Sequence, residues 1–395
     1  MHRARMQGAL LNLASHWCLD PSVVYLNHGS FGACPSAVLD AQAALRLEME
    51  REPVDFLVAK LPARLNAARE TLAAFLGADP SDLVFVTNAT AGVNAVLRSL
   101  SLEAGDELLL TNLTYAACRK TADFVALETG ARVVVAHLPF PCRDEEELIA
   151  PVLSSVTPRT RLVLLDHVTS PTALILPVAR LVRELEARGV DTLVDGAHAP
   201  GMVPLGLSEL GAAYYTGNAH KWLCAPKGAA FLHVRRDRHE HLHPGVISHG
   251  YPAGFRAEFD WTGTFDPTPW LCIPESLRVV GDLQPGGWPQ VMSANRSLVL
   301  QARALFLESM GSDAPCPESM IGSMASLPLP QASRGSPAQR LDYKGLHDWF
   351  RARGVETWLY SDPMLLLRLS AQLYNDLDQF KLLAGLLEEA LHGRR

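Results

Sequence analysis

The sequence predicts an α/β protein, with a large domain built on a mostly parallel sheet and a smaller C-terminal α+β domain. Short apolar runs alternate with amphipathic segments through residues 21–280, which is the pattern of parallel strands joined by crossover helices. The chain has 395 residues, 48% of them hydrophobic, and this is enough for one large core and a satellite. Residues 311–330 resemble a linker that enters a later strand.

We expect residues 1–20 to form an N-terminal helix or arm that packs on the small domain. Residues 21–280 form the predicted large domain and residues 281–395 the predicted small domain. The N-terminal segment MHRARMQGALLNLASHW has only a short apolar patch. No apolar run reaches the roughly 20 residues of a membrane-spanning helix, so we expect no membrane partner.

The charge indicates which partners to expect, and the cysteine content indicates the cellular compartment. The formal charge is -7, from 42 acidic and 35 basic residues without a long run of either sign. Nucleic-acid binding needs a basic face, so we expect no nucleic-acid partner. The seven cysteines are an odd number without paired spacing, which predicts reduced thiols in a cytoplasmic protein.

Along the chain, the first predicted strand is Val23–Asn27. The segment NHGSFGACP that follows reads as a tight turn, because its glycines permit close backbone approach. Helices are predicted at Ser36–Arg51 and Leu61–Leu76 from their apolar spacing.

A strand at Leu83–Val86 leads into a helix that begins near Thr90. The free amides of its first turn could hold an anion such as a phosphate, although a plain capped helix is common. Neither a Walker A loop nor a GxGxxG fingerprint occurs in the sequence, which gives nucleotide cofactors little support.

Further strands of the sheet follow in alternation with helices, at Glu107–Leu110, Arg132–Ala136, Leu162–Asp166, Ala212–Thr216 and Ala229–Val234. Tyr115 begins the helix after the first of these. Its ring could stack on a flat cofactor, or it could simply pack over the helix end. Thr169 and Ser170 could donate to a cofactor oxygen or cap the turn before Pro171.

Two residues at strand ends carry the chemistry. Asp195 closes the buried run Thr192–Val194, and Lys221 follows the next strand between His220 and Trp222. Each residue alone is more often an ordinary turn aspartate or surface lysine. Together they suit a pyridoxal phosphate (PLP) site, in which the lysine forms a Schiff base and the carboxylate keeps the pyridine nitrogen protonated.

The segment HEHLH, His239–His243, matches the HExxH pattern of zinc peptidases. Such a site needs both histidines on one helix face, whereas proline and glycine follow at once. We therefore expect an exposed loop and no metal site. A zinc hydrolase is kept as an alternative that stoichiometric zinc in a colourless protein would support.

The last part of the chain begins with an aromatic-rich and irregular stretch, residues 249–270, which we expect to form a functional loop. A helix near Val291–Met310 would join the two domains. A helix near Tyr343–Arg353, a strand of about Met364–Leu369 and a closing helix to about His392 complete the prediction.

These motifs together resemble the class V aminotransferase family of PLP enzymes, and within it the isopenicillin N epimerase-like branch. The segments that carry the resemblance are YLNHGSFGACP, TNATAGVNAVL, DHVTSPTALILPV, VDGAHAPG, TGNAHKW, FDWTGTFDPTPW and LRLSAQLYN. They run in the family's order over most of the chain. The resemblance implies PLP-dependent fold type I, with a seven-stranded type of sheet.

The resemblance also implies a role for each matching residue. Lys221 and Tyr115 would be catalytic, Arg368 would bind the substrate carboxylate with Asn27 and His28 nearby, and Thr264 would reach the phosphate of a partner subunit in a homodimer. The implied cofactor-binding residues are Ala89, Thr90, Tyr115, Thr169, Asp195, His198, Asn218, His220, Lys221 and Thr264.

The substrate would be an amino acid that loses its α-proton to Lys221. Reprotonation on the opposite face gives an epimerase, which needs a second acid such as Tyr115 or His28. Loss of a β-substituent gives a carbon–sulfur lyase, and protonation of the cofactor gives an aminotransferase. We expect the epimerase first, the lyase second and the aminotransferase last, while a binding protein without catalysis is a further alternative. A persulfide route is disfavoured because residues 354–367 contain no cysteine and Cys316 lies in the predicted linker.

Overall fold

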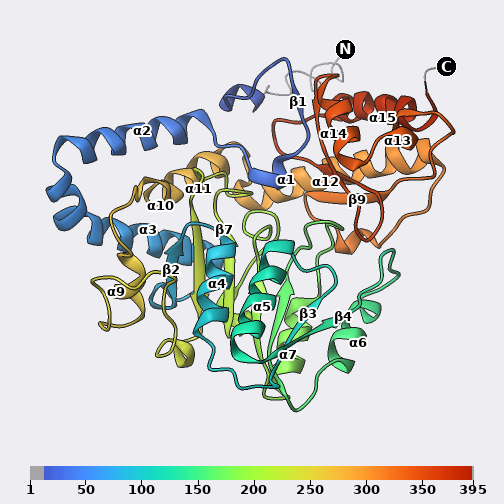
Figure 1. Ribbon diagram of the computed structural model, residues 1–395. Coiled ribbons are helices and arrows are strands. Elements are labelled where there is room, and N and C mark those ends of the chain that lie inside the picture. Colours follow the sequence, from blue (N-terminus) through green and yellow to red (C-terminus); the bar gives the residue numbers. More distant parts are fainter. Residues whose placement is uncertain (1–12, 394–395) are drawn as a thin grey trace.

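A seven-stranded sheet lies at the centre of the larger part of the molecule (Figure 1). The structure is a computed structural model, which describes residues 13–393. The strand order is β2 (Leu83–Val86), β8 (Ala230–Val234), β7 (Tyr214–Asn218), β6 (Asp191–Asp195), β5 (Thr160–Asp166), β3 (Glu107–Thr111) and β4 (Arg132–Ala136). Six of these strands run in one direction, and β8 runs in the opposite direction. The predicted α/β fold with a mostly parallel sheet is therefore confirmed.

Both faces of this sheet are buried, which explains why its strands are apolar without alternation. In β5, Leu162 and Leu164 pack on one side of the sheet with α4 (Ala89–Ser99) and α5 (Ala116–Thr129). Val163 and Leu165 pack on the other side with α3 (Leu61–Leu76), α6 (Glu146–Ser154) and α7 (Val178–Glu186). The sheet thus holds its strand ends rigidly between two helical layers.

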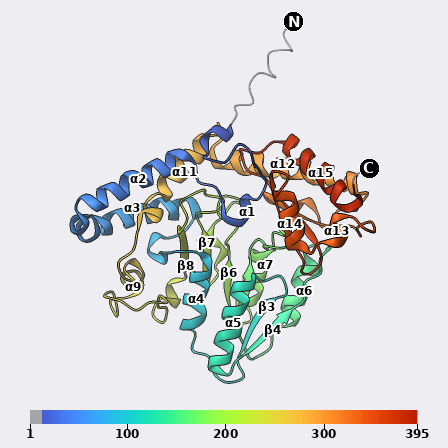
Figure 2. The same ribbon diagram turned by 45° about the horizontal axis from the view of Figure 1, so that its top comes forward.

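A helical arm projects from the body of the molecule, as Figures 1 and 2 show. It consists of α2 (Ser36–Arg51), a π-helical segment η2 (Asp55–Lys60) and α3. The bounds predicted for α2 and α3 are confirmed. The π-helical turn between them was not predicted, because its DFLVAK sequence has no signal distinct from that of an α-helix.

A second, antiparallel sheet contains β11 (Trp358–Tyr360), β12 (Leu366–Ser370) and β9 (Met324–Pro328), in that order. It is accompanied by α12 (Gly287–Met310), α14 (Tyr343–Arg351) and α15 (Leu377–His392). Strand β1 (Val24–Tyr25) pairs with β10 (Val355–Glu356), so the beginning of the described chain adjoins this C-terminal part. Trp17 also packs edge-on against Tyr374 there.

Short elements complete the fold. They are η1 (Leu13–His16), α1 (His28–Phe31), η3 (Pro80–Asp82), α8 (Leu207–Leu210), η4 (Arg236–Arg238), α9 (Phe255–Asp260), α10 (Thr268–Leu271), α11 (Ile273–Asp282), η5 (Glu318–Met320) and α13 (Pro337–Arg340). Three of them correct the predictions. The NHGSF segment forms α1 where a turn was expected, and residues 249–270 contain α9 and α10, which are too short to show helical periodicity.

Two expectations concern the chain as a whole. Most of the predicted N-terminal helix, residues 1–12, lies outside the described residues. Within residues 13–393, no helix combines the length and the apolar character needed to cross a membrane.

Candidate active site

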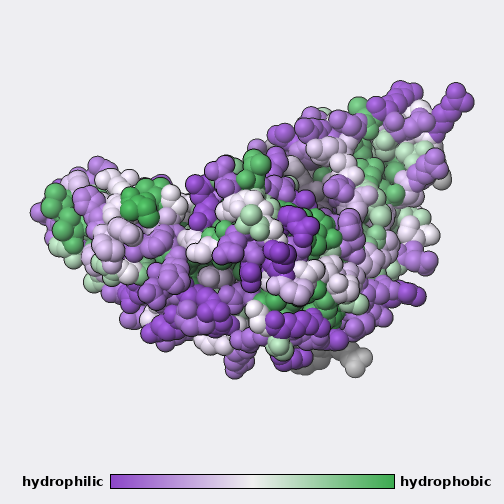
Figure 3. All heavy atoms as spheres, turned by 60° about the horizontal axis from the view of Figure 1, so that its bottom comes forward, coloured by the Kyte–Doolittle hydropathy of each residue, from purple (hydrophilic) through white to green (hydrophobic). Residues whose placement is uncertain are grey.

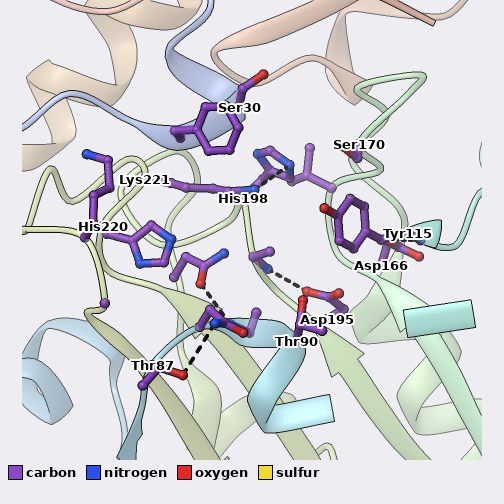
Figure 4. A pocket seen from close by; sticks show the side chains of 18 residues that line it. Ser30, Thr87, Thr90, Tyr115, Asp166, Ser170, Asp195, His198, His220 and Lys221 are labelled. Atoms are coloured by element: carbon purple, nitrogen blue, oxygen red, sulfur yellow. Dashed lines mark hydrogen bonds between the residues drawn. The ribbon is translucent and has the colours of Figure 1, made fainter. Parts of the chain in front are cut away.

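A cavity of about 640 Å³ opens at the carboxyl ends of the parallel strands, beside the short helix α1 (Figure 4). Its lining includes the last residues of three neighbouring strands: Asp166 of β5, Asp195 of β6 and Asn218 of β7. Ligands in open α/β sheets bind at this edge because the strand ends present side chains and loops together. The sheet therefore builds the cavity where the sequence predicted a site.

Asp195 lies on the floor of the cavity and is held from two directions. Its Oδ1 accepts the amide of Ala197 at 3.0 Å, and its Oδ2 accepts the thiol of Cys118 at 3.2 Å. Burial raises its pKa, which the amide and the thiol oppose. This leaves a buried acid with fixed orientation facing the cavity.

Lys221 reaches the cavity beside His198, as the close-up shows (Figure 4). Its Nζ lies 3.2 Å from His198 Nε2. Burial and then the charge of Arg368 lower the pKa of Lys221 to about 8, so roughly half of the amine is neutral at that pH, against roughly 0.3% for an ordinary lysine. Burial also holds the pKa of His198 well below its usual value, so the imidazole is neutral and Nε2 can accept from the amine. This amine can act as a nucleophile and a base.

The start of α4 forms an anion-binding end of the cavity. The Ala89 amide donates to Asn218 Oδ1 at 2.9 Å, and the Ala91 amide donates to the capping Asn88 side chain at 2.8 Å. The amide and hydroxyl of Thr90 have no hydrogen-bond partner within residues 13–393, and Thr90 lines the cavity. A free amide at a helix N-terminus favours an anion. Gly92 lets this helix approach β7, since a Cβ there would lie 2.3 Å from the Thr216 hydroxyl.

His220 and Lys227 also line the cavity. The Nδ1 of His220 donates to the carbonyl of Ala229 at 2.9 Å, which fixes the ring. Lys227 lies two residues before that carbonyl in the same loop. Lys227 therefore brings potential positive charge to the cavity. Burial lowers the pKa of His220 to about 4, so its imidazole is neutral.

Arg368 lies in the middle of β12 and is only 1% exposed. Its two Nη atoms donate to neutral acceptors: the Ser170 carbonyl at 3.0 Å, the Tyr360 hydroxyl at 2.9 Å, the Ser30 hydroxyl at 2.8 Å and Asn27 Oδ1 at 3.3 Å. No carboxylate pairs with it among the described residues. A buried guanidinium without a counter-charge, next to cavity-lining serines, is suited to bind a carboxylate.

Tyr115 is the N-cap residue of α5 and lies across the cavity from Lys221 (Figure 4). Its side chain is 45% exposed and lines the cavity. Partial burial raises its pKa, so the phenol keeps its proton at neutral pH. Lys221 and Tyr115 can therefore act on one ligand from different sides.

Five of the proposed residues do not line this cavity. Two of them, Asn27 and Arg368, lie directly behind its wall, in contact with Ser30 and Ser170. The other three are held elsewhere. His28 is fully buried behind it, where its ring bonds the Tyr374 hydroxyl at 2.8 Å and the Lys221 carbonyl at 3.1 Å. Thr169 faces its own turn, since its hydroxyl accepts the Leu174 amide at 2.9 Å. Thr264 is exposed and is not part of the lining within this chain. His28 is thus placed to support Lys221 and not to touch a substrate.

Sequence reasoning missed several residues that line the cavity, among them Ser30, Asp166 and Lys227. Of the two adjacent hydroxyl residues, Ser170 and not Thr169 faces the cavity, and Ser170 also contacts Arg368. Asp166 was noted only as the end of a strand. Like Asp195, it is the last residue of a buried strand, and this shared position could have identified it as a candidate.

The HEHLH segment does not form a helix. It follows η4 as turns, as predicted. His239 bonds the Val234 carbonyl at 2.9 Å, while His243 bonds Glu258 at 2.7 Å. The two histidines thus bind different partners, a backbone carbonyl and a carboxylate.

The cavity residues fit PLP, the cofactor expected from the sequence. A buried carboxylate, Asp195, is available for a protonated ring nitrogen. An amine of lowered pKa, Lys221, is available for the aldehyde, and the unpartnered amide of Thr90 is available for the phosphate. These are three different chemical functions, and the cofactor needs all of them in one cavity.

Comparisons with known proteins agree with this chemistry. The model of the family named Aminotransferase class-V matches residues 25–257. The chain is 37% identical to the isopenicillin N epimerase of Streptomyces clavuligerus, over 94% of this chain and 95% of that protein. It is 33% identical to a putative L-cysteine desulfhydrase of Oryza sativa subsp. japonica, over 79% of this chain and 68% of that protein.

Solved structures share the fold. A complex of the cystine C–S lyase C-DES superposes with a TM-score of 0.79 at 20% identity, over 93% of this chain and 98% of that one. The cysteine desulfurase CsdA of Escherichia coli gives a TM-score of 0.77 at 21% identity, over 96% of this chain and 97% of that one. The predicted fold class is confirmed by this likeness.

Proposed function

Since the chain belongs to the class V aminotransferase family, we propose that this PLP-dependent enzyme epimerises an amino-acid substrate at its α-carbon. The similarity to isopenicillin N epimerases over nearly the whole chain supports this outcome of the shared chemistry. The observation that carries the proposal is the pair formed by Lys221 and Tyr115 on different sides of one cavity. An epimerase needs one group to remove the α-proton and another to return a proton to the opposite face.

Bound in this cavity, PLP supplies an electron sink for the negative charge that develops on the α-carbon. Asp195 would keep its ring nitrogen protonated, and Thr90, Asn218 and His220 would hold its phosphate end. Asn218 would act mainly through α4, because its oxygen already accepts the Ala89 amide.

Lys221 Nζ would take the α-proton. Its pKa of about 8 suits a general base that works near neutral pH, because a useful fraction is unprotonated while the amine remains basic. Neutral His198, 3.2 Å away, would accept a hydrogen bond from the protonated amine and keep it directed into the cavity.

Tyr115 Oη would give the proton that completes epimerisation. Its raised pKa keeps the hydroxyl protonated, which is the state an acid needs. We prefer it to His28, whose ring is occupied by Tyr374 and the Lys221 carbonyl.

Arg368 would bind the α-carboxylate of the substrate, with Asn27 orienting its guanidinium and Ser30 and Ser170 at the cavity wall. The four neutral acceptors around Arg368 leave its charge uncompensated, so a carboxylate is the expected partner. A free α-amino acid group is therefore the part of the substrate that this site would recognise.

Carbon–sulfur β-elimination is the second candidate function. The likeness to a putative L-cysteine desulfhydrase and to a hercynylcysteine sulfoxide lyase of Schizosaccharomyces pombe favours it. This reaction needs Lys221 and a good leaving group but no second acid, so it would leave Tyr115 without a proton-transfer role.

Product analysis separates the two candidates. We expect purified enzyme, given isopenicillin N and a panel of L-amino acids in separate reactions, to convert at least one of them to its α-epimer, detected by chiral chromatography. Pyruvate or another keto acid should not accumulate. Stoichiometric keto acid and released thiol without any epimer would overturn the epimerase proposal and support the lyase.

We also propose that the enzyme is a homodimer. Apolar side chains are exposed on the projecting arm (Figure 3), where Leu47 is 64%, Val54 73% and Val58 68% exposed. A second copy of the chain could cover these side chains. Thr264 of each copy would then reach the phosphate-binding end of the other copy's cavity.

Analytical ultracentrifugation tests this arrangement. The wild type should sediment with twice the mass of the chain, and the double variant Val54→Asp, Val58→Asp should sediment with the mass of a single chain. A monomeric wild type would exclude the arrangement.

A cytoplasmic location is part of the same proposal. All seven cysteines are free thiols, which suits a reducing compartment. Fractionation of the source cells tests this location.

A further inference from the structure

The strongest unassigned feature of the molecule is a second buried carboxyl group beside Asp195. Asp166 and Asp195 are the last residues of neighbouring parallel strands and lie in register with each other. Backbones of paired strands are about 4.8 Å apart, and in-register residues point to the same side of the sheet. Both side chains line the cavity.

The surroundings of these two carboxyl groups differ. Both oxygens of Asp195 accept a hydrogen bond, from Ala197 and from Cys118. The Oδ1 of Asp166 accepts the Tyr115 amide at 3.3 Å, and the Thr114 hydroxyl also interacts with this carboxyl group. Its Oδ2 is buried without a hydrogen-bond partner among residues 13–393. A buried carboxylate oxygen without a donor is costly, whereas a protonated one is much less so.

Two buried carboxyl groups on neighbouring, in-register strand ends cannot both be ionised at low cost, which favours a single proton on the pair. Burial and the charge of Asp195 raise the pKa of Asp166 well above its usual value. The other titratable groups that interact with the pair are Tyr115 and Cys118 at the start of α5, Tyr215 of β7, and Lys221 after β7. The positive charge of Lys221 favours the ionised form of Asp195.

We propose that Asp166 is a positioning residue that keeps a proton beside ionised Asp195, so that the pair presents a single negative charge, located on Asp195. Asp166 also holds the Tyr115 amide at the start of α5, while Cys118 of the same helix holds Asp195. The first turn of α5 thus connects Asp195, the expected partner of the cofactor's ring nitrogen, to Tyr115. The inference rests on the proposed function only through PLP, and not on epimerisation.

Infrared spectroscopy of the whole protein tests where the proton lies. We expect the wild-type protein at neutral pH to show the carbonyl band of a protonated carboxyl group, and Asp166→Asn to lack it. Asp106→Asn is the matched control, because Asp106 is also buried but is ion-paired with Arg161 at 2.8 Å. Its substitution should leave the band unchanged.

Two further measurements separate this proposal from a merely structural role of Asp166. Asp195→Asn should shift the loss of the band to lower pH, because the neighbouring charge no longer holds the proton. Asp166→Asn, which cannot ionise, should keep the PLP affinity and the visible absorption of the wild type within about twofold at neutral pH, whereas Asp195→Asn should lose both.

Two results would overturn the proposal. One is a wild-type protein without the protonated band at neutral pH. The other is an Asp166→Asn variant that folds and loses PLP as Asp195→Asn does, since the charge would then lie on Asp166. The infrared band can be read whether or not any substrate is epimerised, so failure of the proposed function would be recognised separately.

Discussion

Replacing Lys221 with alanine is expected to lower turnover by at least about 10⁴-fold, because one amine serves as both the point of covalent attachment and the base. The rest of the cavity would remain. Asp195 and the start of α4 should still hold PLP without a covalent bond. Borohydride reduction followed by peptide mass analysis should find PLP on residue 221 of the wild type and no such adduct in the variant.

Lys381→Ala provides a matched control, because Lys381 is an exposed lysine of α15 that pairs with Asp378. It should retain full activity and the adduct on Lys221. Activity of Lys221→Ala within tenfold of the wild type would contradict the assignment of the base. An adduct on another lysine would contradict the assignment of the attachment point.

Replacing Tyr115 with phenylalanine is expected to lower the epimerisation rate by about 10²- to 10⁴-fold, the usual range for a general acid. The ring would remain, so stacking on the cofactor should be kept and PLP affinity should change little. Lys221 could still remove and return the α-proton on its own face. The rate of α-proton exchange should therefore fall much less than the rate of epimerisation, as measured by NMR in deuterated water.

Tyr251→Phe is the control for this change, since Tyr251 is an exposed tyrosine that contacts His243. It should epimerise at the wild-type rate. If Tyr115→Phe also epimerises at that rate, another group must supply the second proton. If exchange and epimerisation fall together, the phenol acts on binding or on both steps.

The sequence predicted the centre of the site because Asp195 and Lys221 each follow a buried strand. Parallel strands bring their carboxyl ends to one edge, so strand ends separated along the chain meet in space. The register between β5 and β6 was not predictable from the pattern. For that reason the pairing of Asp166 with Asp195 emerged only from the structure.

The direction in which a side chain points within a tight turn also could not be predicted from the sequence pattern. Thr169 and Ser170 are adjacent hydroxyl residues, and the turn decides which one faces the cavity. Thr169 is used inside the turn, where Ala173 adopts a positive φ of 55°. His28 is similar, because α1 replaces the expected turn and directs the imidazole toward Tyr374.

Arg368 shows the limit of spacing arguments most clearly. It lies on β12, in a separate sheet and far along the chain from the large sheet. Periodicity places it on a strand but cannot say that the strand faces Ser170 and Asn27. Its role was predicted only from the family resemblance of the LRLSAQLYN segment.

The most direct test of the account is the fate of the α-hydrogen when the wild-type enzyme acts on a single enantiomer in deuterated water. We expect deuterium at the α-carbon of the recovered amino acid and a steady conversion to the opposite configuration, with the β-substituent intact. Keto acid with loss of the β-substituent and no inverted amino acid, or inversion without any uptake of deuterium into the product, would contradict it.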